Sequence, residues 1–321
     1  MMICLLKGYT GYAFIEDVSA HMTSYSLSMN QNVIESGGIG RIYNNGYFNR
    51  WKLDAVADYS QYDLSITCEA NSSILIKALY MMYYKFHSSN SVKFYDDSIK
   101  IYLEYSNANL TSIELSVGID AVATITFGFV TFGNNISVYY GEGGYNLQAK
   151  RNAPSSLVGD CLMPYWAWGV AYTRKEENDE ESKLVFGKGL CDFSFSYQQS
   201  VTPKYGCCAS TSTKAVGPKA IVFGLPNVTW SLTYAMVESV NTYYNIASNK
   251  IALCGDKLEF KYQKKNTKSS QDTKTEAHIY FYDVYTTSYS PSVGNSGDVN
   301  KLTVSGMVFG TMSYSVNENA N

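Results

Sequence analysis

Strict two-residue alternation of small polar and apolar residues is the feature that most limits the folds open to this chain. It is clearest in Ser24-Tyr25-Ser26-Leu27-Ser28-Met29, and it recurs at Ser194-Phe195-Ser196-Tyr197 and at Thr124-Ile125-Thr126-Phe127-Gly128-Phe129. Successive side chains of a β-strand point to opposite sides of the sheet, so this period predicts strands with one buried face and one wet face. The 29 tyrosines among 321 residues agree, because Tyr suits a half-buried pleated surface. We therefore predict a mainly β protein.

Six further segments have the apolar composition that is typical of strands. They are Val92 to Tyr95, Ile99 to Tyr105, Ile136 to Tyr140, Leu258 to Tyr262, Ile279 to Tyr285 and Leu302 to Phe309. With turns between them, these segments extend the predicted β structure over both halves of the chain.

One segment departs from this pattern. From Ser72 to His87, apolar residues recur at steps of three and four, which predicts a helix capped by Asn71 or Ser72. We expect the helix to cover an open sheet face, with its Leu and Met stripe in the core and not in a cofactor site. A weaker helical pattern lies at Val240 to Ala247.

The two halves of the chain share a sequence pattern. Three matches carry it: Tyr25-Ser-Leu-Ser-Met with Phe193-Ser-Phe-Ser-Tyr, Asn32-Val33 with Ser200-Val201, and Asp63 to Thr67 with Thr229 to Thr233. Both halves also end on an apolar strand that contains glycine, Ile125 to Phe132 and Leu302 to Met312. We predict two tandem domains, residues 1–150 and 151–321, with the boundary between Gly141 and Val158. One large β unit is the alternative.

Three segments near the domain boundary and in the second half have their own composition. The charge run from Arg174 to Lys183 and the Lys-rich stretch from Lys261 to Glu276 are interpreted as a solvated loop and a long mobile loop. The aromatic group Tyr165-Trp166-Ala167-Trp168 is interpreted as a buried strand that opens the second half. An exposed patch for a carbohydrate or a partner is the alternative for this group.

The residue types of common catalytic and metal sites are scarce. Only His21, His87 and His278 are present, and the chain has no phosphate-binding loop, zinc-protease or esterase motif. Gly37-Gly38-Ile39-Gly40 is interpreted as a turn. The acidic pairs Asp96-Asp97 and Glu176-Glu177 are not interpreted as acid and base couples, because adjacent residues point to opposite faces on a strand and are simply hydrated on a loop. We predict no catalytic residue, no metal site, no cofactor and no enzymatic activity. An enzyme with dispersed catalytic residues is the alternative.

Cysteine usage, charge and hydropathy bear on location and partners. The seven cysteines are interpreted as reduced thiols, and the adjacent Cys207-Cys208 pair has a redox or soft-metal role as its alternative. A formal charge of -3 excludes a broad basic surface for nucleic acid phosphates. No run of 18 apolar residues and no complete signal-peptide core occur, so we predict no membrane partner and a cytoplasmic site of synthesis.

The second half resembles the tail tube proteins of long-tailed bacteriophages. The matching residues are Phe193-Ser-Phe-Ser-Tyr-Gln-Gln-Ser-Val-Thr-Pro-Lys-Tyr-Gly206, Pro218 to Gly224, and Asn227-Val-Thr-Trp-Ser-Leu-Thr233. The first half is similar at Tyr25 to Gly38 and at Asp54 to Thr67, although it lacks the central Gly and Pro. The resemblance extends over about two thirds of the chain, through short motifs.

The resemblance implies a β-sandwich or small barrel in each half, with a flanking helix and long hairpins. It implies a structural virion protein, made in the host cytoplasm, whose rings stack into a hollow tube for DNA ejection. Two domains in one chain imply rings of three chains with pseudo-sixfold symmetry. The lumen is then expected to be polar and neutral or acidic, so that DNA and a tape-measure protein pass without specific binding.

Other roles share this pattern. Partners implied by the resemblance are a tail sheath, a baseplate hub and a tail terminator, and a hub, terminator or baseplate adaptor with the same fold is itself an alternative role. A β-sandwich binding module for receptor binding or capsid decoration, which does not polymerise, is the alternative from a different class.

Overall fold

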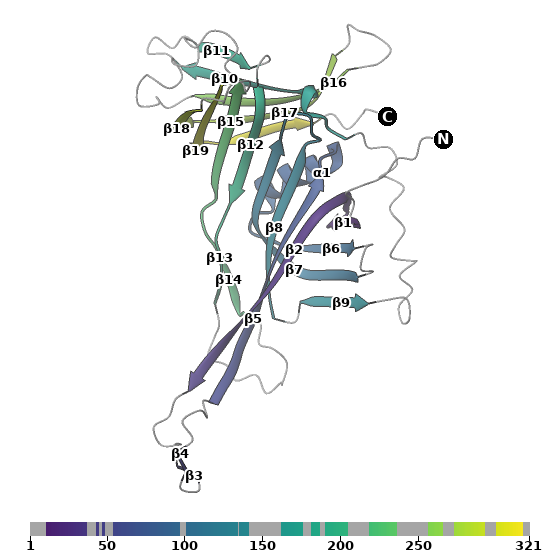
Figure 1. The fold of residues 1–321 in the computed structure, drawn as a ribbon, viewed down its shortest axis with the longest axis vertical. Coiled ribbons are helices and arrows are strands. Elements are labelled where there is room, and N and C mark those ends of the chain that lie inside the picture. The colour runs from purple at the N-terminus through teal and green to yellow at the C-terminus, as the bar shows by residue number, and fades with distance from the viewer. Residues whose placement is uncertain are drawn as a thin grey trace, which may run out of the picture.

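The computed structural model describes residues 11–36, 43–44, 47–48, 54–96, 101–133, 135–140, 162–175, 181–186, 190–204, 218–235, 256–265, 273–292 and 300–316. These residues are mainly β, as the alternation predicts, with one α-helix among them (Figure 1). The strands of the first half and those of the second half form distinct groups that meet along one shared sheet.

Six strands of the first half close into a barrel. In pairing order they are β1 (Gly11–Ile15), β2 (Val18–Ser36), β5 (Asp54–Glu69), β8 (Thr124–Phe132), β7 (Ile101–Val117) and β6 (Ser89–Asp96), and β6 returns to β1. All neighbours are antiparallel, and Ile66, Leu115 and Phe127 inside the barrel are fully buried. The alternation at Ser24 to Met29 and at Thr124 to Phe129 therefore belongs to barrel strands.

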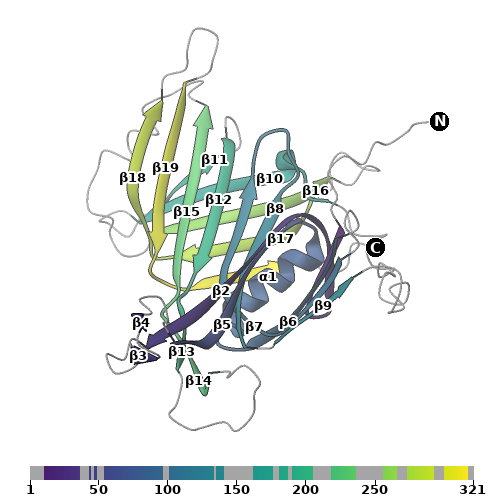
Figure 2. The ribbon, with the colours of Figure 1, turned by 60° about the horizontal axis from the view of Figure 1, so that its bottom comes forward.

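Helix α1 (Ser72–Tyr84) lies across the opening of this barrel (Figure 2). Its buried apolar residues, among them Leu75, Leu79 and Met82, face the barrel core, as the sequence predicts. The helix begins after Asn71, whose side-chain oxygen accepts a hydrogen bond from the Ile74 N–H at 2.8 Å. Asn71 is thus the cap, and the helix ends three residues before the predicted end.

The second half is a sandwich of two sheets. One sheet contains β12 (Leu190–Gln198), β15 (Asn227–Ala235), β19 (Lys301–Val308) and β18 (Val284–Ser292). The other contains β11 (Glu181–Phe186), β10 (Trp168–Lys175), β16 (Lys257–Lys265), β17 (Thr273–Tyr282) and β20 (Met312–Val316). Aromatic rings fill the space between them: the ring centroids of Phe193 and Phe260 are 5.0 Å apart, and those of Phe195 and Phe281 are 5.3 Å apart.

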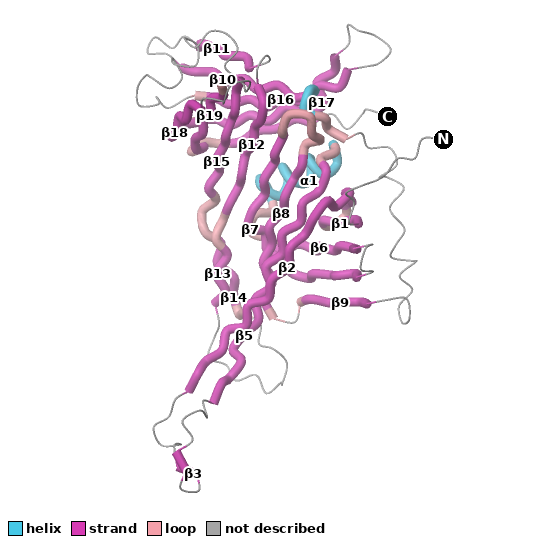
Figure 3. The backbone as a smooth tube through the Cα atoms, in the orientation of Figure 1, coloured by secondary structure: helices cyan, strands magenta, loops and turns pink. Residues whose placement is uncertain are grey.

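Two long hairpins extend beyond these cores in the same direction (Figure 3). One is the distal part of β2 and β5, and the other is formed by β13 (Val201–Lys204) and β14 (Ala220–Phe223). The remaining elements are β3 (Tyr43–Asn44), β4 (Tyr47–Phe48), β9 (Ile136–Tyr140) and the 3-10 turn η3 (Tyr165–Ala167).

The pairing registers of β2, β5 and β8 in the first half match those of β12, β15 and β19 in the second half. Ser26 pairs with Ser65 and Ser65 with Gly128, while Ser194 pairs with Ser231 and Ser231 with Ser305. The register also shifts at corresponding points, between Met22 and Ser24 in β2 and between Leu190 and Asp192 in β12. These are the positions that the sequence matches bring together.

The pairings of β7 in the first half match those of β17 and β18 in the second half. Asn107 lies within β7 with a φ of 56°, and Asp283 separates β17 from β18 with a φ of 52°. Before these residues, β9 pairs with β7 and β20 pairs with β17; after them, β8 pairs with β7 and β19 pairs with β18. Asn and Asp tolerate the left-handed conformation better than other non-glycine residues. In each half, a single such residue therefore separates the two stretches of chain that pair with different strands.

Three sequence interpretations are wrong in part. Lys261 to Glu276 is not one loop, because β16 extends to Lys265 and β17 begins at Thr273. The charge run from Arg174 to Lys183 has strand at both ends, in the β10–β11 hairpin. Charged residues on an outer sheet face remain hydrated while their backbone pairs, so charge alone does not exclude a strand. The predicted strand at Ile279 to Tyr285 is divided at Asp283.

The aromatic group Tyr165 to Trp168 also departs from its interpretation. Tyr165 to Ala167 form the 3-10 turn η3, and β10 begins only at Trp168. Trp168 is buried, whereas Trp166 is 61% exposed. Outside the described residues lie Val240 to Ala247, Gly141 to Val158 with the boundary between 1–150 and 151–321, Gly37 to Gly40, Asp97, Glu176-Glu177 and Cys207-Cys208.

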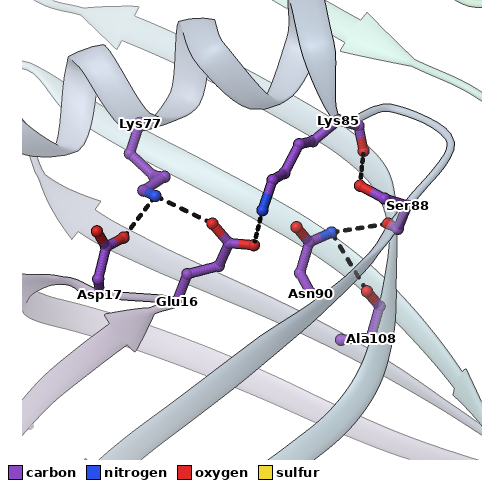
Figure 4. A network of polar contacts seen from close by, with 7 residues as sticks. All are labelled: Glu16, Asp17, Lys77, Lys85, Ser88, Asn90 and Ala108. Carbon is purple, nitrogen blue, oxygen red and sulfur yellow. Dashed lines mark hydrogen bonds and ion pairs between the residues drawn. The ribbon is translucent and has the colours of Figure 1, made fainter.

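An ion-pair network fixes α1 to the turn between β1 and β2 (Figure 4). The Lys77 Nζ lies 3.0 Å from Glu16 Oε2 and 2.5 Å from Asp17 Oδ1, and the Lys85 Nζ lies 2.6 Å from Glu16 Oε1. Partial burial opposes ionisation of Glu16, but the hydrogen bonds and charges of Lys85 and Lys77 outweigh it and hold the pKa of Glu16 below its usual value. The network thus joins helix and barrel while the carboxylate is ionised.

Replacement of Glu16 by Gln is expected to lower the free energy of unfolding by about 1 kcal/mol at pH 7, because both lysines are partly exposed to solvent. The pKa is depressed in the folded state, so this contribution is present above the unfolded value of about 4.3 and is lost as the pH falls through the folded value. Urea unfolding of both proteins between pH 3 and pH 7 measures it. A difference that does not shrink at low pH would show lost packing in place of lost charge.

Replacement of Gly306 by Ala is expected to destabilise the fold by about 1–3 kcal/mol through overpacking. A methyl group there would overlap the Tyr285 carbonyl oxygen and lie 2.6 Å from the Trp230 ring. Gly169→Ala is the matched control, since the nearest atom to its methyl group, the Lys261 carbonyl oxygen, is 4.0 Å away. Thermal and urea unfolding of the two variants test this, and equal stabilities would contradict it.

Candidate functional site: the polar face and open edges of the long sheet

The two halves are joined by direct main-chain pairing between β7 and β12. The register runs antiparallel from Val117 opposite Phe193 to Ser112 opposite Gln198. The next residue, Gln199, is buried and donates its side-chain amide to the Leu110 carbonyl at 2.7 Å. Its N–H donates to the Thr111 carbonyl at 2.9 Å. This joint makes one continuous sheet across the two halves.

Eight strands follow one another in this sheet, in the order β2, β5, β8, β7, β12, β15, β19 and β18. Residues that pair directly across neighbouring strands point to the same face of a sheet. One face carries mainly Ser, Thr and charged residues along all eight strands. Examples of paired positions on it are Ser26, Ser65, Gly128, Ser112, Gln198, Asn227, Thr229, Met307, Ser305 and Ser288.

The charged residues on this face of the described strands are mostly acidic. They are Asp63, Glu69, Glu114 and Asp192, against Lys301. None of them is fully buried. The face is therefore a wet surface with an acidic balance.

Threonine pairs on this face repeat between the halves. The hydroxyl oxygens of Thr67 and Thr126 are 3.0 Å apart, and those of Thr233 and Thr303 are 3.2 Å apart. Each pair bridges neighbouring strands, β5 with β8 and β15 with β19, at corresponding registers. Cross-strand hydroxyl pairs of this kind stabilise a sheet face that stays in water.

The opposite face of the same strands forms the core. Phe127, Leu115, Phe195, Trp230 and Val304 are each no more than 2% exposed. The sheet is thus strongly two-sided, with an apolar side covered by the rest of the chain and a polar side with no strand layer over it in Figure 2.

Among the described strands, both outer strands of the long sheet have an open edge. β18 ends the strand order there and pairs only with β19. Residues 23–36 of β2 pair with β5 on one side, and β1 reaches only to Met22 on the other. Along the open stretch of β2, Leu27 is 41% exposed and Met29 is 57% exposed. Unpaired edges with apolar residues are typical sites for pairing with another chain.

The histidines are dispersed, as the sequence indicates. His21 packs against Tyr12, and His87 packs against Phe86. His278 contacts Glu259 through Nε2, and its Nδ1 lies 2.9 Å from the Tyr280 hydroxyl. Cys68 is buried and Cys191 is half-buried, both as free thiols.

No group of three or more His, Cys, Asp or Glu in the described ranges has the arrangement to hold a metal ion. No helix of that part of the chain has the length and apolarity needed to cross a membrane. The expectations of no enzymatic activity and no cofactor stay predictions.

Comparison with known proteins yields a weak structural likeness. No protein-family model matches the chain, and no curated protein matches it. Among solved structures, the crystal structure of an Hcp protein aligns with 47% of this chain and 99% of that chain, at 13% identity and a TM-score of 0.24. The functional assignment therefore depends on the geometry of the chain itself.

The sequence identifies the strands of this surface but not their order. The alternations at Ser24 to Met29 and Ser194 to Tyr197 mark its polar residues, and the structure places both on the same face. The β7–β12 joint has no local signal, because pairing between strands distant in sequence depends on the assembled fold. Gln199, the residue that fastens the joint, gives no sign in a polar stretch of the sequence.

Proposed function

We propose that this chain is a structural protein of the tail tube type, which assembles with copies of itself into stacked rings. The observation that carries the proposal is the eight-stranded sheet with one polar face and one buried face, which has an open edge at each end in the part of the chain that the structure describes. The unpaired backbone N–H and C=O groups at the two edges of such a sheet find partners when copies join edge to edge. A closed ring leaves no edge unpaired.

The proposal includes a tandem duplication, with each half a version of the same β domain. Its support is the matched registers, the matched shifts before Ser24 and Asp192, and the left-handed residues Asn107 and Asp283. Two equivalent domains per chain fit a ring of three chains with pseudo-sixfold symmetry. The barrel of the first half and the sandwich of the second differ in whether two strands are continuous, as β2 and β7 are, or divided, as into β11 and β12 and into β17 and β18.

The long sheet is proposed to line the lumen of the ring with its polar face. Three copies of eight strands make a barrel of about 24 strands, whose backbone diameter at a spacing of about 4.8 Å is at least about 37 Å. A barrel of that size leaves an aqueous channel. Its Ser, Thr and acidic lining repels phosphate groups, so duplex DNA would slide without binding.

In this role the protein is part of a bacteriophage tail, assembled in the host cytoplasm. Viral DNA and a tape-measure protein would pass through the lumen, and a sheath, a hub and a terminator would contact the outside and the ends of the tube. Its stacking contacts would come from the hairpins β2–β5 and β13–β14, which extend in one direction. No catalytic step is part of this function.

The expected assembly is a hollow ring or tube in negative-stain electron micrographs of the purified protein. Light scattering of a discrete ring fraction should give three times the 35.7 kDa mass of the chain. A ring of six chains would keep the tube and reject the duplicated-domain arrangement. Compact particles that never polymerise over a range of concentration and salt would point instead to a hub, terminator or binding module.

Replacement of Glu114 by Lys is expected to convert the lumen into a DNA-binding surface. Glu114 lies exposed on the polar face, and the change repeats in every chain of a ring. The assembled Glu114→Lys variant should bind duplex DNA with an affinity that falls steeply as the salt concentration rises, while the wild-type assembly should not bind DNA. Glu104→Lys is the control, since Glu104 lies on the part of β7 outside the long sheet. Equal DNA binding by both variants would contradict a polar-face lumen.

A further inference from the structure

The pairing of β7 with β12 indicates how two copies of the chain can pair. In this joint, the last strand that the first half adds to the long sheet pairs with the first strand that the second half adds. The corresponding strands at the two ends of the sheet are β18 and β2. Both have open edges in the described part of the chain.

The correspondence between strands is fixed residue by residue. The register shift around Thr111 in β7 matches the shift around Thr287 in β18. In the same way, the shift between Met22 and Ser24 in β2 matches the shift between Leu190 and Asp192 in β12. Ser290 thus takes the place of Glu114, and Ser28 takes the place of Ser196, which pairs with Glu114.

We infer that β18 of one copy pairs antiparallel with β2 of a second copy, with Ser290 opposite Ser28. The inference rests on the proposed ring assembly and specifies its contact. The neighbouring pairs are Ser292 with Ser26 and Ser288 with Asn30, and between them lie Pro291 with Leu27 and Tyr289 with Met29. Pro291 has no N–H, so its pair with Leu27 contributes at most one main-chain hydrogen bond.

This register keeps the two faces of the sheet continuous across the contact. Ser26, Ser28 and Asn30 lie on the polar face through their pairing with Ser65, Asp63 and Gln61. Ser288, Ser290 and Ser292 lie on the same face through their pairing with β19. A shift by one residue would place Leu27 and Met29 opposite serines of the polar face, which strands with one buried face disfavour.

Exposure of the apolar residues on β2 supports the same contact. Leu27 and Met29 correspond to Phe195 and Tyr197 in the internal joint. Phe195 is 1% exposed and Tyr197 is 2% exposed, whereas Leu27 is 41% and Met29 is 57% exposed. The two exposed residues therefore lie where the internal joint is covered by a neighbouring half. A second copy of the chain supplies that cover.

The identity of one further residue agrees with the correspondence. Gln199, which fastens the internal joint through the carbonyl groups of Leu110 and Phe86, lies at the position of β12 that corresponds to Gln31 of β2. A glutamine therefore stands at the same register position in both halves.

Disulfide trapping with the double variant Ser28→Cys/Ser290→Cys tests the register. Directly opposed residues have Cβ atoms about 4.5–5.5 Å apart, close to disulfide geometry, while diagonal residues are about 7–8 Å apart. Mild oxidation should give covalent chains of two and three copies on a non-reducing gel, linked through Cys at 28 and 290 by peptide mass mapping. Ser28→Cys/Ser292→Cys is the off-register control, and the wild type controls for its seven native cysteines.

Electron microscopy of the same samples separates the inference from the proposed function. Rings in which the disulfide between positions 28 and 290 forms readily, and the one between positions 28 and 292 of the control variant forms little, support the register. If rings form but the 28–290 disulfide does not, or forms no faster than the 28–292 disulfide, the register is overturned and the ring proposal stays intact. A protein that remains monomeric at every concentration overturns both.

Ring assembly of a variant with a charge at the proposed contact is a second test. Met29→Lys should fold normally, because Met29 is exposed in the single chain, but should lower the fraction of protein in rings at least tenfold. Met29→Leu keeps an apolar side chain and should assemble as the wild type does. Unchanged assembly of Met29→Lys, with an unchanged unfolding temperature, would overturn the inferred contact.

Discussion

The main-chain ladder between β7 and β12 is the interaction on which the long sheet depends. Without it, each half would present an unpaired strand edge toward the other, and every backbone N–H and C=O there would need another partner. The ladder satisfies these groups, and Gln199 adds side-chain hydrogen bonds to the Leu110 and Phe86 carbonyl groups. Two β units thereby become one surface with a polar side and an apolar side.

Local structure was largely predictable from the sequence, because alternation and helical period are local properties. The strand at Ile136 to Tyr140 has the predicted bounds, and Asn71 is one of the two predicted caps of α1. The match of Asp63 to Thr67 with Thr229 to Thr233 also reappears in the structure, where both segments pair with corresponding residues of β8 and β19.

The features that the sequence did not reveal depend on contacts between distant residues. Asp283 divides a run of apolar residues that otherwise has the pattern of one strand, and only its conformation shows the division. The strand ending at Lys265 has the composition of a loop, but its backbone pairs with β17. The wet face of the long sheet could not be assigned from the alternation, because which residues share a face across eight strands depends on their order and register.

The contact between α1 and β20 has a consequence for synthesis of the chain. β20 is the last described strand, and partial burial raises the pKa of its Tyr314, with Tyr84, Tyr80 and Tyr83 of α1 nearby. About 230 residues separate Tyr84 from Met312, so at about 5–20 residues per second the helix leaves the ribosome some ten to fifty seconds before this partner. The tyrosine-rich end of α1 therefore gains its contact with β20 only after the second half has been made, and Tyr83 and Tyr84 stay 47% and 64% exposed even in the folded chain.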